Sequence, residues 1–266
     1  MKKVRIDLLL VERGLAESRT QAQRLVMAGQ VRVDGQVILK PSTPVPSEAS
    51  VDLQAGPRFV SRGGEKLEAA LTAFRIEVSG QVCADVGAST GGFTDCLLQH
   101  GAKKVYAVDV GKGLLHWQLR NDPRVSVMEG TNARFLEALP ERVSLVTVDA
   151  AFISLKLLLP VVKGWLQAEG EVVALIKPQF EAGRSQSAKG EGVIRDPAVH
   201  RQVLLEVLTF AQSTGWGVGG LMRSPLRGPK GNVEFFACLS PSATVGRPLT
   251  ELVESVLTIS GDVLPP

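Results

Sequence analysis

The apolar residues near the start of the chain recur at helical spacing in two short segments. The first is IDLLLVERG, residues 6–14, and the second is SRTQAQRLVMAG, residues 18–29. Each segment closes with glycine, a common helix stop, and Ser18 followed by Gln21 has the spacing of a capping box at the start of the second segment. The pattern therefore predicts two short helices.

Residues 30–40 change to an alternating pattern, with apolar positions on both sides of Asp34-Gly35. This dipeptide between alternating runs predicts a β-hairpin. Residues 41–50 contain three prolines and three serines and predict a rigid turn or surface loop before a last strand, SVDLQ. Together, the helices and strands predict a small α+β domain over residues 1–57.

After a predicted linker at residues 58–64, apolar strand-like runs alternate with helical stretches up to residue 242. This alternation predicts an α/β domain with a Rossmann-like, mostly parallel open sheet and helices on both faces, over residues 65–242. Ligands bind beyond the carboxyl ends of such strands, so the charged residues there should meet at one rim. The charged strand ends are Asp85, Asp109, Glu129, Asp149 and Lys177. Residues 243–266 are predicted to form a partly helical tail.

Composition narrows the class of protein. A chain of 266 residues with 44% hydrophobic content can bury the core of one large and one small domain. No segment approaches the ~20 apolar residues of a membrane-spanning helix, and Asp7 and Glu12 interrupt the apolar start. We therefore expect a cytoplasmic protein with no membrane partner. The three cysteines lie among apolar neighbours without metal-ligand spacing, so we expect small core residues and no metal site.

The positive charge is concentrated near the N-terminus. Residues 1–60 contain nine Lys or Arg and six Asp or Glu, whereas residues 61–266 contain 21 of each kind. The pattern R-I-D-x-x-L-x-x-R-G, followed by S-R-x-x-A-x-x-L-V-x-x-G-x-V-x-V-D-G, resembles the alpha-L RNA-binding domain. That resemblance implies RNA contacts, where arginine can bind phosphate, although the same residues could form only a solvated surface. The implied residues are Arg5, Arg13, Arg19, Arg24 and Arg32.

The segment CADVGASTGGFTD, residues 83–95, places an acid before a glycine-rich turn, and a second acid ends the next strand 24 residues later. This order fits S-adenosylmethionine (SAM) better than a pyrophosphate. One carboxylate can hold the methionine ammonium, a helix N-terminus suits the methionine carboxylate, and the second acid can accept ribose hydroxyls. The alternative is a glycine turn that only allows close packing. The predicted SAM-binding residues are Asp85, Gly87, Ser89, Gly91, Gly92, Phe93, Asp109 and Asn132.

The strand VVALIK ends unexpectedly in Lys177. A methyl sulfonium is already electrophilic, so transfer to a hydroxyl mainly requires that the acceptor be held close and its proton removed. A buried lysine near a second cation can exist in the neutral form and act as that base. Lys66, Asp149 and Glu234 are expected at the same rim, although each could instead have a surface or capping role.

In this order, Lys66, Asp149, Lys177 and Glu234 resemble the K-D-K-E tetrad of FtsJ-like ribose 2'-O-methyltransferases. With the N-terminal module, the chain resembles the TlyA (haemolysin A) family through DVGASTGGFTD, VDAAFISL, LIKPQFEAGR and GPKGNVEF. The resemblance implies SAM as the methyl donor and 2'-O-methylation of ribosomal RNA in assembled or partly assembled subunits, with Lys177 as general base. It also implies that RFV, residues 58–60, couples RNA docking to SAM binding.

Three other functions remain open at this stage. DAAF, residues 149–152, is close to the D-P-P-Y loop of methyltransferases that act on base amines, with alanines in place of the prolines. A membrane-active haemolysin and a noncatalytic RNA-binding module are the other two. Residues 182–193 are rich in Gly, Ser and Lys, and we expect a mobile loop that orders on RNA, with Arg227 and Lys230 lining the same entrance.

Overall fold

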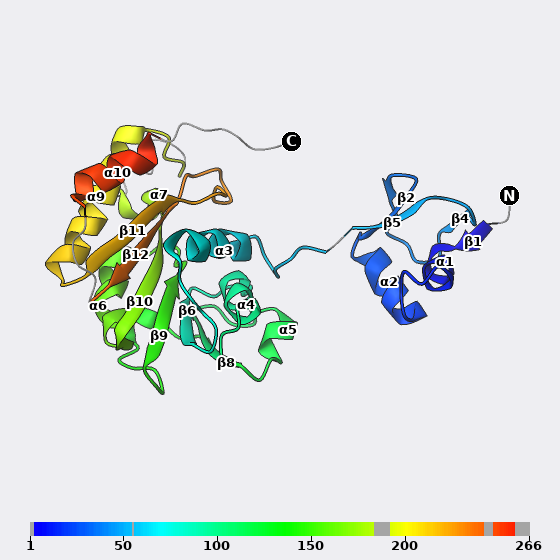
Figure 1. Ribbon diagram of the computed structural model, residues 1–266, viewed down its shortest axis with the longest axis horizontal. Helices are drawn as coiled ribbons and strands as arrows, with labels where there is room; N and C mark the ends of the chain where they lie inside the picture. Colours follow the sequence, from blue (N-terminus) through cyan, green and yellow to red (C-terminus); the bar gives the residue numbers. More distant parts are fainter. Residues whose placement is uncertain (1–2, 55, 184–191, 242–246, 259–266) are drawn as a thin grey trace. The chain divides into compact units, whose positions relative to one another are not determined.

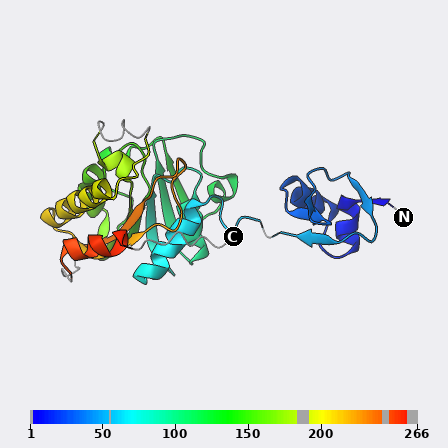
Figure 2. The same ribbon diagram turned by 90° about the horizontal axis from the view of Figure 1, so that it is seen from above.

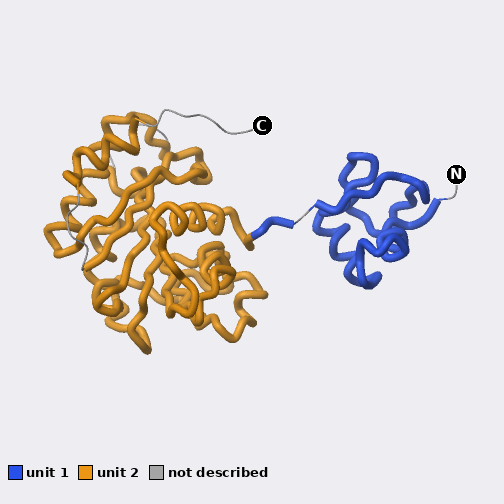
Figure 3. Tube along the Cα trace, viewed as in Figure 1, with its two compact units in different colours: residues 1–58 blue, residues 59–266 orange. Residues whose placement is uncertain are grey.

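The chain forms two compact units, Met1–Arg58 and Phe59–Pro266 (Figure 3). The computed structural model describes residues 3–54, 56–183, 192–241 and 247–258. Phe59, in the segment predicted as a linker, is 2% exposed and packs in a core with Leu67. The backbone N–H of Val60 donates to Asp95 Oδ2 at 2.8 Å. Residues 59 and 60 are therefore anchored in the second unit.

The first unit contains the two predicted helices and the hairpin. Helix α1 spans Ile6–Glu12 and α2 spans Arg19–Met27, where the Ser18 side chain accepts a hydrogen bond from the N–H of Gln21. The Gln21 side chain accepts from the N–H of Glu17, so the cap is close to a capping box. Asp34 and Gly35 both have positive φ, 49° and 80°, as a two-residue hairpin turn requires. The three-stranded sheet has the order β3-β2-β5, with β2 at Val31–Val33, β3 at Gln36–Val37 and β5 at Val51–Leu53.

The prediction of a turn or loop throughout residues 41–50 is wrong at its centre. Strand β4, Pro44–Pro46, pairs with β1, Lys3–Arg5, and Val45 lies opposite Val4. Val45 is 4% exposed and belongs to the core of this unit. Proline lacks an N–H but is tolerated in a short edge strand, so a proline-rich composition alone does not exclude pairing.

The second unit is built on a seven-stranded sheet of order β11-β12-β10-β9-β6-β7-β8 (Figures 1 and 2). Six of the strands run in the same direction, and the exception, β12, is antiparallel to both of its neighbours, β10 and β11. The fold is therefore the mostly parallel α/β sheet that the sequence predicts. The strands are β6 Val82–Val86, β7 Lys104–Asp109, β8 Val125–Glu129, β9 Val143–Val148, β10 Leu166–Ile176, β11 Gly217–Arg223 and β12 Phe235–Ser240.

Helices cover both faces of this sheet and produce two cores (Figure 1). Along β10, Val172, Ala174 and Ile176 face one core while Val173 and Leu175 face the other, which explains why the strand is apolar from residue 172 to its end. One face carries α3 Gly63–Phe74, α4 Gly92–Gln99 and α5 Trp117–Arg120. The other carries η1 Ala133–Phe135, α6 Leu155–Lys163, α9 Pro197–Ser213 and α10 Leu249–Leu257.

Helix α10 lies in the segment predicted as a partly helical tail, and its Val253 and Val256 join the core. A last short helix, α7 Pro178–Glu181, directly follows Lys177. All three cysteine side chains are buried thiols. Across the described ranges, no helix has the length and apolar character needed to cross a membrane.

Candidate active site

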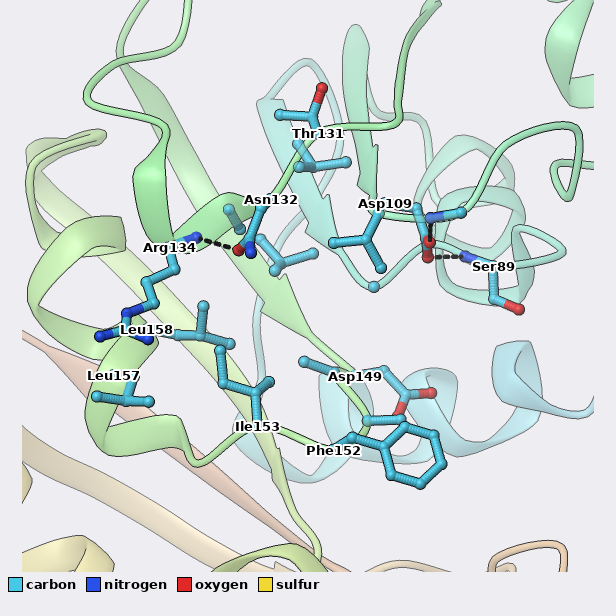
Figure 4. A pocket seen from close by; sticks show the side chains of 18 of the residues that line it. Ser89, Asp109, Thr131, Asn132, Arg134, Asp149, Phe152, Ile153, Leu157 and Leu158 are labelled. Carbon is cyan, nitrogen blue, oxygen red and sulfur yellow. Dashed lines mark hydrogen bonds between the residues drawn. The ribbon is translucent and has the colours of Figure 1, made fainter.

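The carboxyl ends of the parallel strands surround a cavity of about 690 Å³ (Figure 4). Its wall includes Gly87 and Ser89 after β6, Asp109 at the end of β7, Asn132 after β8 and Asp149 after β9. Residues Ile153, Leu157 and Leu158 add an apolar side. The predicted convergence of strand ends at one rim is thus present in the structure.

The loop after β6 requires glycine at its first position, Gly87, because the backbone of Asp149 passes close to it. Gly87 has a φ of 83°, and a Cβ atom there would lie 2.7 Å from the backbone oxygen of Asp149. Gly91 has a φ of 97°, and a Cβ there would meet the Leu119 side chain at 2.2 Å. Gly91 therefore permits the packing of the loop, whereas Gly87 also shapes the cavity.

Two polar side chains from neighbouring strand ends are held in place at this cavity. Asp109 accepts hydrogen bonds from the N–H groups of Ser89, at 2.8 Å, and Gly111, at 2.6 Å. Each carboxylate oxygen keeps further lone-pair capacity, so Asp109 can still accept two hydroxyl groups. Asn132 uses its oxygen to cap η1 through the N–H of Arg134, at 3.0 Å, and its amide nitrogen remains the group that can donate to a ligand.

The structure does not place Asp85 on the wall of this cavity, contrary to its predicted contact with a methionine ammonium. Asp85 is fully buried and accepts hydrogen bonds from the hydroxyls of Thr94, at 2.7 Å, and Thr147, at 3.2 Å. Thr147 lies directly opposite Asp85 on β9, so the strand register directs the carboxylate inward. Burial raises the pKa of Asp85 to about 7, and the charge of Asp149 adds to this effect, while the Thr94 hydrogen bond opposes it.

This buried carboxyl predicts a specific pH dependence of stability. The folded-state pKa lies above the ordinary value of 3.8, so folded protein binds more protons than unfolded protein between 3.8 and about 7. Stability should fall as pH rises through this window, and Asp85→Asn should remove that loss. By thermal unfolding, we expect the Tm of Asp85→Asn relative to wild type to increase by about 3 °C or more between pH 5 and pH 8. A constant difference over this range would contradict the assignment.

A second cavity, of about 250 Å³, brings together Lys66, Asp149, Lys177 and Glu234. Lys66 Nζ lies 2.7 Å from Glu234 Oε2, and Lys177 Nζ lies 2.5 Å from Asp149 Oδ1. The Lys177 and Lys66 side chains are only 12% and 11% exposed, and the Glu234 side chain is 1% exposed. The sequence predicts that Lys66, as a second cation, favours the neutral form of Lys177. In the structure each lysine instead pairs with its own carboxylate, Lys66 with Glu234 and Lys177 with Asp149.

The sheet topology explains why these residues meet. Lys177 directly follows β10, and Glu234 directly precedes the antiparallel strand β12, with Ile176 opposite Phe235 in the pairing register. Asp149 follows β9, the parallel neighbour of β10 on its other side, while Lys66 reaches the cavity from the first turn of α3. Gly92 and Phe93 also line this second cavity rather than the larger one.

Phe152 is the functional candidate that the sequence reasoning missed. Its ring is 90% exposed and its φ of 62° is uncommon for a residue with a bulky side chain. It borders both the larger of the two cavities described above, of about 690 Å³, and a third cavity, of about 840 Å³, that also contains Lys177 and Glu234. The ring contacts Phe180 with centroids 4.9 Å apart. The DAAF motif marked this position, but no sequence pattern indicates that the ring faces solvent.

Glu129 was expected only as a strand end, but it also shapes the larger cavity. Its carboxylate accepts from the N–H groups of Gly113, Leu114 and Leu115, at 2.8 to 3.1 Å, and pairs with Arg120 at 2.8 Å. The Arg120 hydrogen bond and these backbone N–H groups lower the pKa of Glu129 to about 2. Because Leu114 lines the cavity, Glu129 is a positioning residue for its wall.

The five arginines predicted to contact RNA have different surroundings in the first unit. Arg5 and Arg19 share the buried Asp7 carboxylate, at 2.9 and 3.1 Å, and the Arg5 hydrogen bonds are the largest cause of a pKa for Asp7 well below its usual range. Arg13 donates to the carbonyls of Ala49 and Ser47. Arg32 donates to the carbonyl of Gly35, and Arg24 is exposed on α2. Arg13 and Arg32 therefore stabilise loops of this unit.

Two other predictions concern the surroundings of the cavities. Arg227 lines the second cavity and Lys230 the third. The predicted mobile loop at residues 182–193 lies mostly outside the described residues, which omit 184–191. Within the part of the chain that is described, no group of three or more His, Cys, Asp or Glu side chains could hold a metal ion.

Comparison with known families matches residues 59–240 to the FtsJ-like methyltransferase family and residues 4–51 to the S4 domain. The chain is 49% identical over 242 residues to "16S/23S rRNA (cytidine-2'-O)-methyltransferase TlyA" of Mycobacterium tuberculosis, covering 90% of each protein. It is 40% identical over 240 residues to "Hemolysin A" of Brachyspira hyodysenteriae, covering 88% of this chain and 98% of that protein. A solved structure, "Putative hemolysin from Streptococcus thermophilus", aligns with a TM-score of 0.71 at 45% identity and covers 96% of both chains.

Proposed function

Because the chain belongs to the FtsJ-like methyltransferase family, in its TlyA group, we propose that it transfers a methyl group from SAM to a ribose 2'-hydroxyl of ribosomal RNA. One observation carries the proposal. The cavity that contains Lys66, Asp149, Lys177 and Glu234 shares Gly87, Ser89 and Asp149 with the larger cavity. A methyl donor in the larger cavity and an acceptor beside Lys177 would thus be neighbours.

The residues of the larger cavity fit SAM. Asp109 can accept the two ribose hydroxyls, Asn132 can donate to the adenine, and the absence of a side chain at Gly87 leaves room beside Asp149. When bound, SAM supplies a methyl group that is already electrophilic. The chain's own contribution is to hold the acceptor close to this group and to remove the acceptor's proton.

Lys177 is the general base in this proposal. For this step, Nζ of Lys177 accepts the proton of the 2'-hydroxyl, and the Asp149 carboxylate, 2.5 Å away, stabilises the ammonium ion that results. The Lys66–Glu234 pair, buried at the same cavity, joins α3 to the start of β12 and fixes the wall against which the acceptor lies. Both carboxylates keep the lysines oriented toward one small space.

A test of the function uses tritiated SAM with separate samples of assembled small subunits, assembled large subunits and protein-free ribosomal RNA. The proposal predicts that at least one of these samples gains label in its RNA. Protein that binds SAM in calorimetry but labels RNA in none of the three samples would contradict it. The partner implied by the S4 domain and by the named TlyA relative is ribosomal RNA.

The exposed ring of Phe152 is well placed to stack on a base of the acceptor RNA, since it lines the third cavity together with Lys177 and also borders the cavity of about 690 Å³. We expect Phe152→Ala to lower kcat/KM for RNA by about 10- to 100-fold, because stacking on an aromatic ring contributes about 1–3 kcal/mol per base. Phe152→Tyr should retain most of the activity.

Phe135 provides a matched control for this change. It is also an exposed phenylalanine, 72% exposed, but it lines none of the three cavities. Phe135→Ala should leave kcat/KM within about 2-fold of wild type, a bound set by the small effect of changes at sites without functional contacts. Equal losses in the two alanine variants, measured by label transfer, would contradict the role of Phe152.

A further inference from the structure

A pocket of about 450 Å³ adjoins the reaction cavities and is lined by four cationic side chains, Arg195, Arg223, Arg227 and Lys230. They come from separate parts of the chain: the segment before α9, the end of β11 and the loop that leads to β12. Among the described residues that line this pocket, there is no Asp or Glu. The neighbouring Asp196 is instead used to cap α9, where its side chain accepts from the N–H of Ala198 at 2.8 Å.

The walls of this pocket are held together by a buried side chain. Asn232 is 3% exposed; its amide nitrogen donates to the carbonyl of Gly192 at 2.8 Å, and its oxygen accepts from the N–H of Ile194 at 2.9 Å. These bonds fix the segment that carries Arg195 against the loop that carries Arg227 and Lys230. The pocket is therefore preorganised, which limits the entropy lost when a ligand binds.

A buried histidine and apolar side chains form the floor of the pocket. His200, 5% exposed, bonds through Nε2 to the carbonyl of Ile194. Burial lowers the pKa of His200; the hydrogen bond to the Ile194 carbonyl opposes this shift, and the positive charge of Arg223 adds to it. The aromatic ring of Phe235 and the side chains of Val233 and Val256 complete the floor.

The pocket is continuous with the place of the reaction. Arg227 lines both this pocket and the cavity that contains Lys177, while Lys230 lines both this pocket and the cavity next to Phe152. An RNA strand whose target nucleotide lies beside Lys177 would therefore meet Arg227 and Lys230 first. It would then meet Arg195 and Arg223. Arginine binds phosphate oxygens in bidentate fashion, and such contacts fix position without reading base sequence.

We propose that this pocket, which nothing in the proposed methyl transfer requires, binds the backbone phosphates that flank the target nucleotide. The inference rests on the proposed function and deepens it, since it assigns the path of the RNA strand away from Lys177. The occupant is an RNA phosphate, because the lining is cationic and shares Arg227 with the second cavity and Lys230 with the third. The pocket positions the strand and takes no part in the chemistry.

The test compares Arg195→Glu with Lys103→Glu in the full-length protein. Both residues are exposed and both changes reverse one charge, but Lys103 precedes β7 at the opposite, amino end of the parallel strands. Affinity for protein-free ribosomal RNA is measured by fluorescence anisotropy at several salt concentrations. We expect Arg195→Glu to weaken binding about 10-fold at 0.1 M salt and to reduce the magnitude of the log–log salt slope by about one, and Lys103→Glu to change neither.

Arg223→Gln and Lys230→Gln provide second variants, and calorimetry with SAM reports whether each protein is folded and keeps its cofactor site. Equal RNA affinities for Arg195→Glu and Lys103→Glu would overturn the inference. The same result is expected if the pocket binds inorganic phosphate but does not contact RNA. Wild-type protein that binds RNA without methylating it would refute the proposed function alone. The comparison of binding affinities would still decide the role of the pocket.

Discussion

Replacing Lys177 with alanine should reduce methyl transfer to ribosomal RNA by at least about 100-fold, because positioned general bases contribute about 10²- to 10⁴-fold to rate. Lys177 lines the second and third cavities, where the acceptor RNA is expected, but not the cavity of about 690 Å³ that is assigned to SAM. SAM affinity in calorimetry should therefore remain within about 3-fold of wild type, as expected for a residue outside that site. Initial rates with tritiated SAM and saturating RNA measure the loss.

Two further variants separate loss of the base from loss of charge. Lys177→Arg keeps a cation but cannot accept a proton at neutral pH, so it should be as inactive as Lys177→Ala. Lys156→Ala removes a partly exposed lysine that pairs with Glu206 on the helical layer and should retain wild-type rates. Near-full activity of Lys177→Ala would instead favour transfer to a base amine, which needs no such base.

Replacing Gly87 with alanine should abolish SAM binding over the accessible concentration range, a loss of at least about 100-fold. The new Cβ would lie 2.7 Å from the backbone oxygen of Asp149 and 2.9 Å from its carbonyl carbon. Backbone cannot rotate away as a side chain can, so the loop after β6 must move, and with it Ser89 and the wall shared by two cavities. Calorimetric titration of the variant with SAM measures the effect.

Gly80 offers a matched control for the backbone strain alone. It has a φ of 73°, close to the 83° of Gly87, but a Cβ there would meet nothing within 4 Å. Gly80→Ala should thus lower stability by about 1 kcal/mol, the cost of a left-handed conformation, and leave SAM affinity unchanged. Wild-type SAM affinity in Gly87→Ala, or equal loss in both variants, would contradict the role of the close approach.

Sequence patterns predicted the fold and the convergence of the site because both follow from local regularities. Only neighbouring residues determine the Asp34-Gly35 turn, the apolar run at the end of β10 and the alternation of helices and strands. Parallel strands bring their carboxyl ends to one rim, so the positions of Asp109, Asp149 and Lys177 at strand ends were enough to group them.

What could not be predicted depends on register and on contacts between distant segments. Asp85 turns inward because Thr147 lies opposite it on β9, a pairing that no local pattern specifies. Lys177 and Glu234 lie near each other because Ile176 pairs with Phe235, a register that no local pattern specifies. The pocket around Arg195 joins residues far apart in sequence, since Arg223, the next cationic residue of its lining, comes 28 residues later.

Alkaline digestion of RNA labelled by this protein with tritiated SAM tests the central claim most directly. Alkali cleaves RNA through attack of the 2'-oxygen on the adjacent phosphate, and a 2'-O-methyl group blocks that attack at the modified nucleotide. If Lys177 deprotonates a ribose hydroxyl, the label should appear in an alkali-resistant dinucleotide. Label released entirely as mononucleotides would place the methyl group on a base and contradict the account.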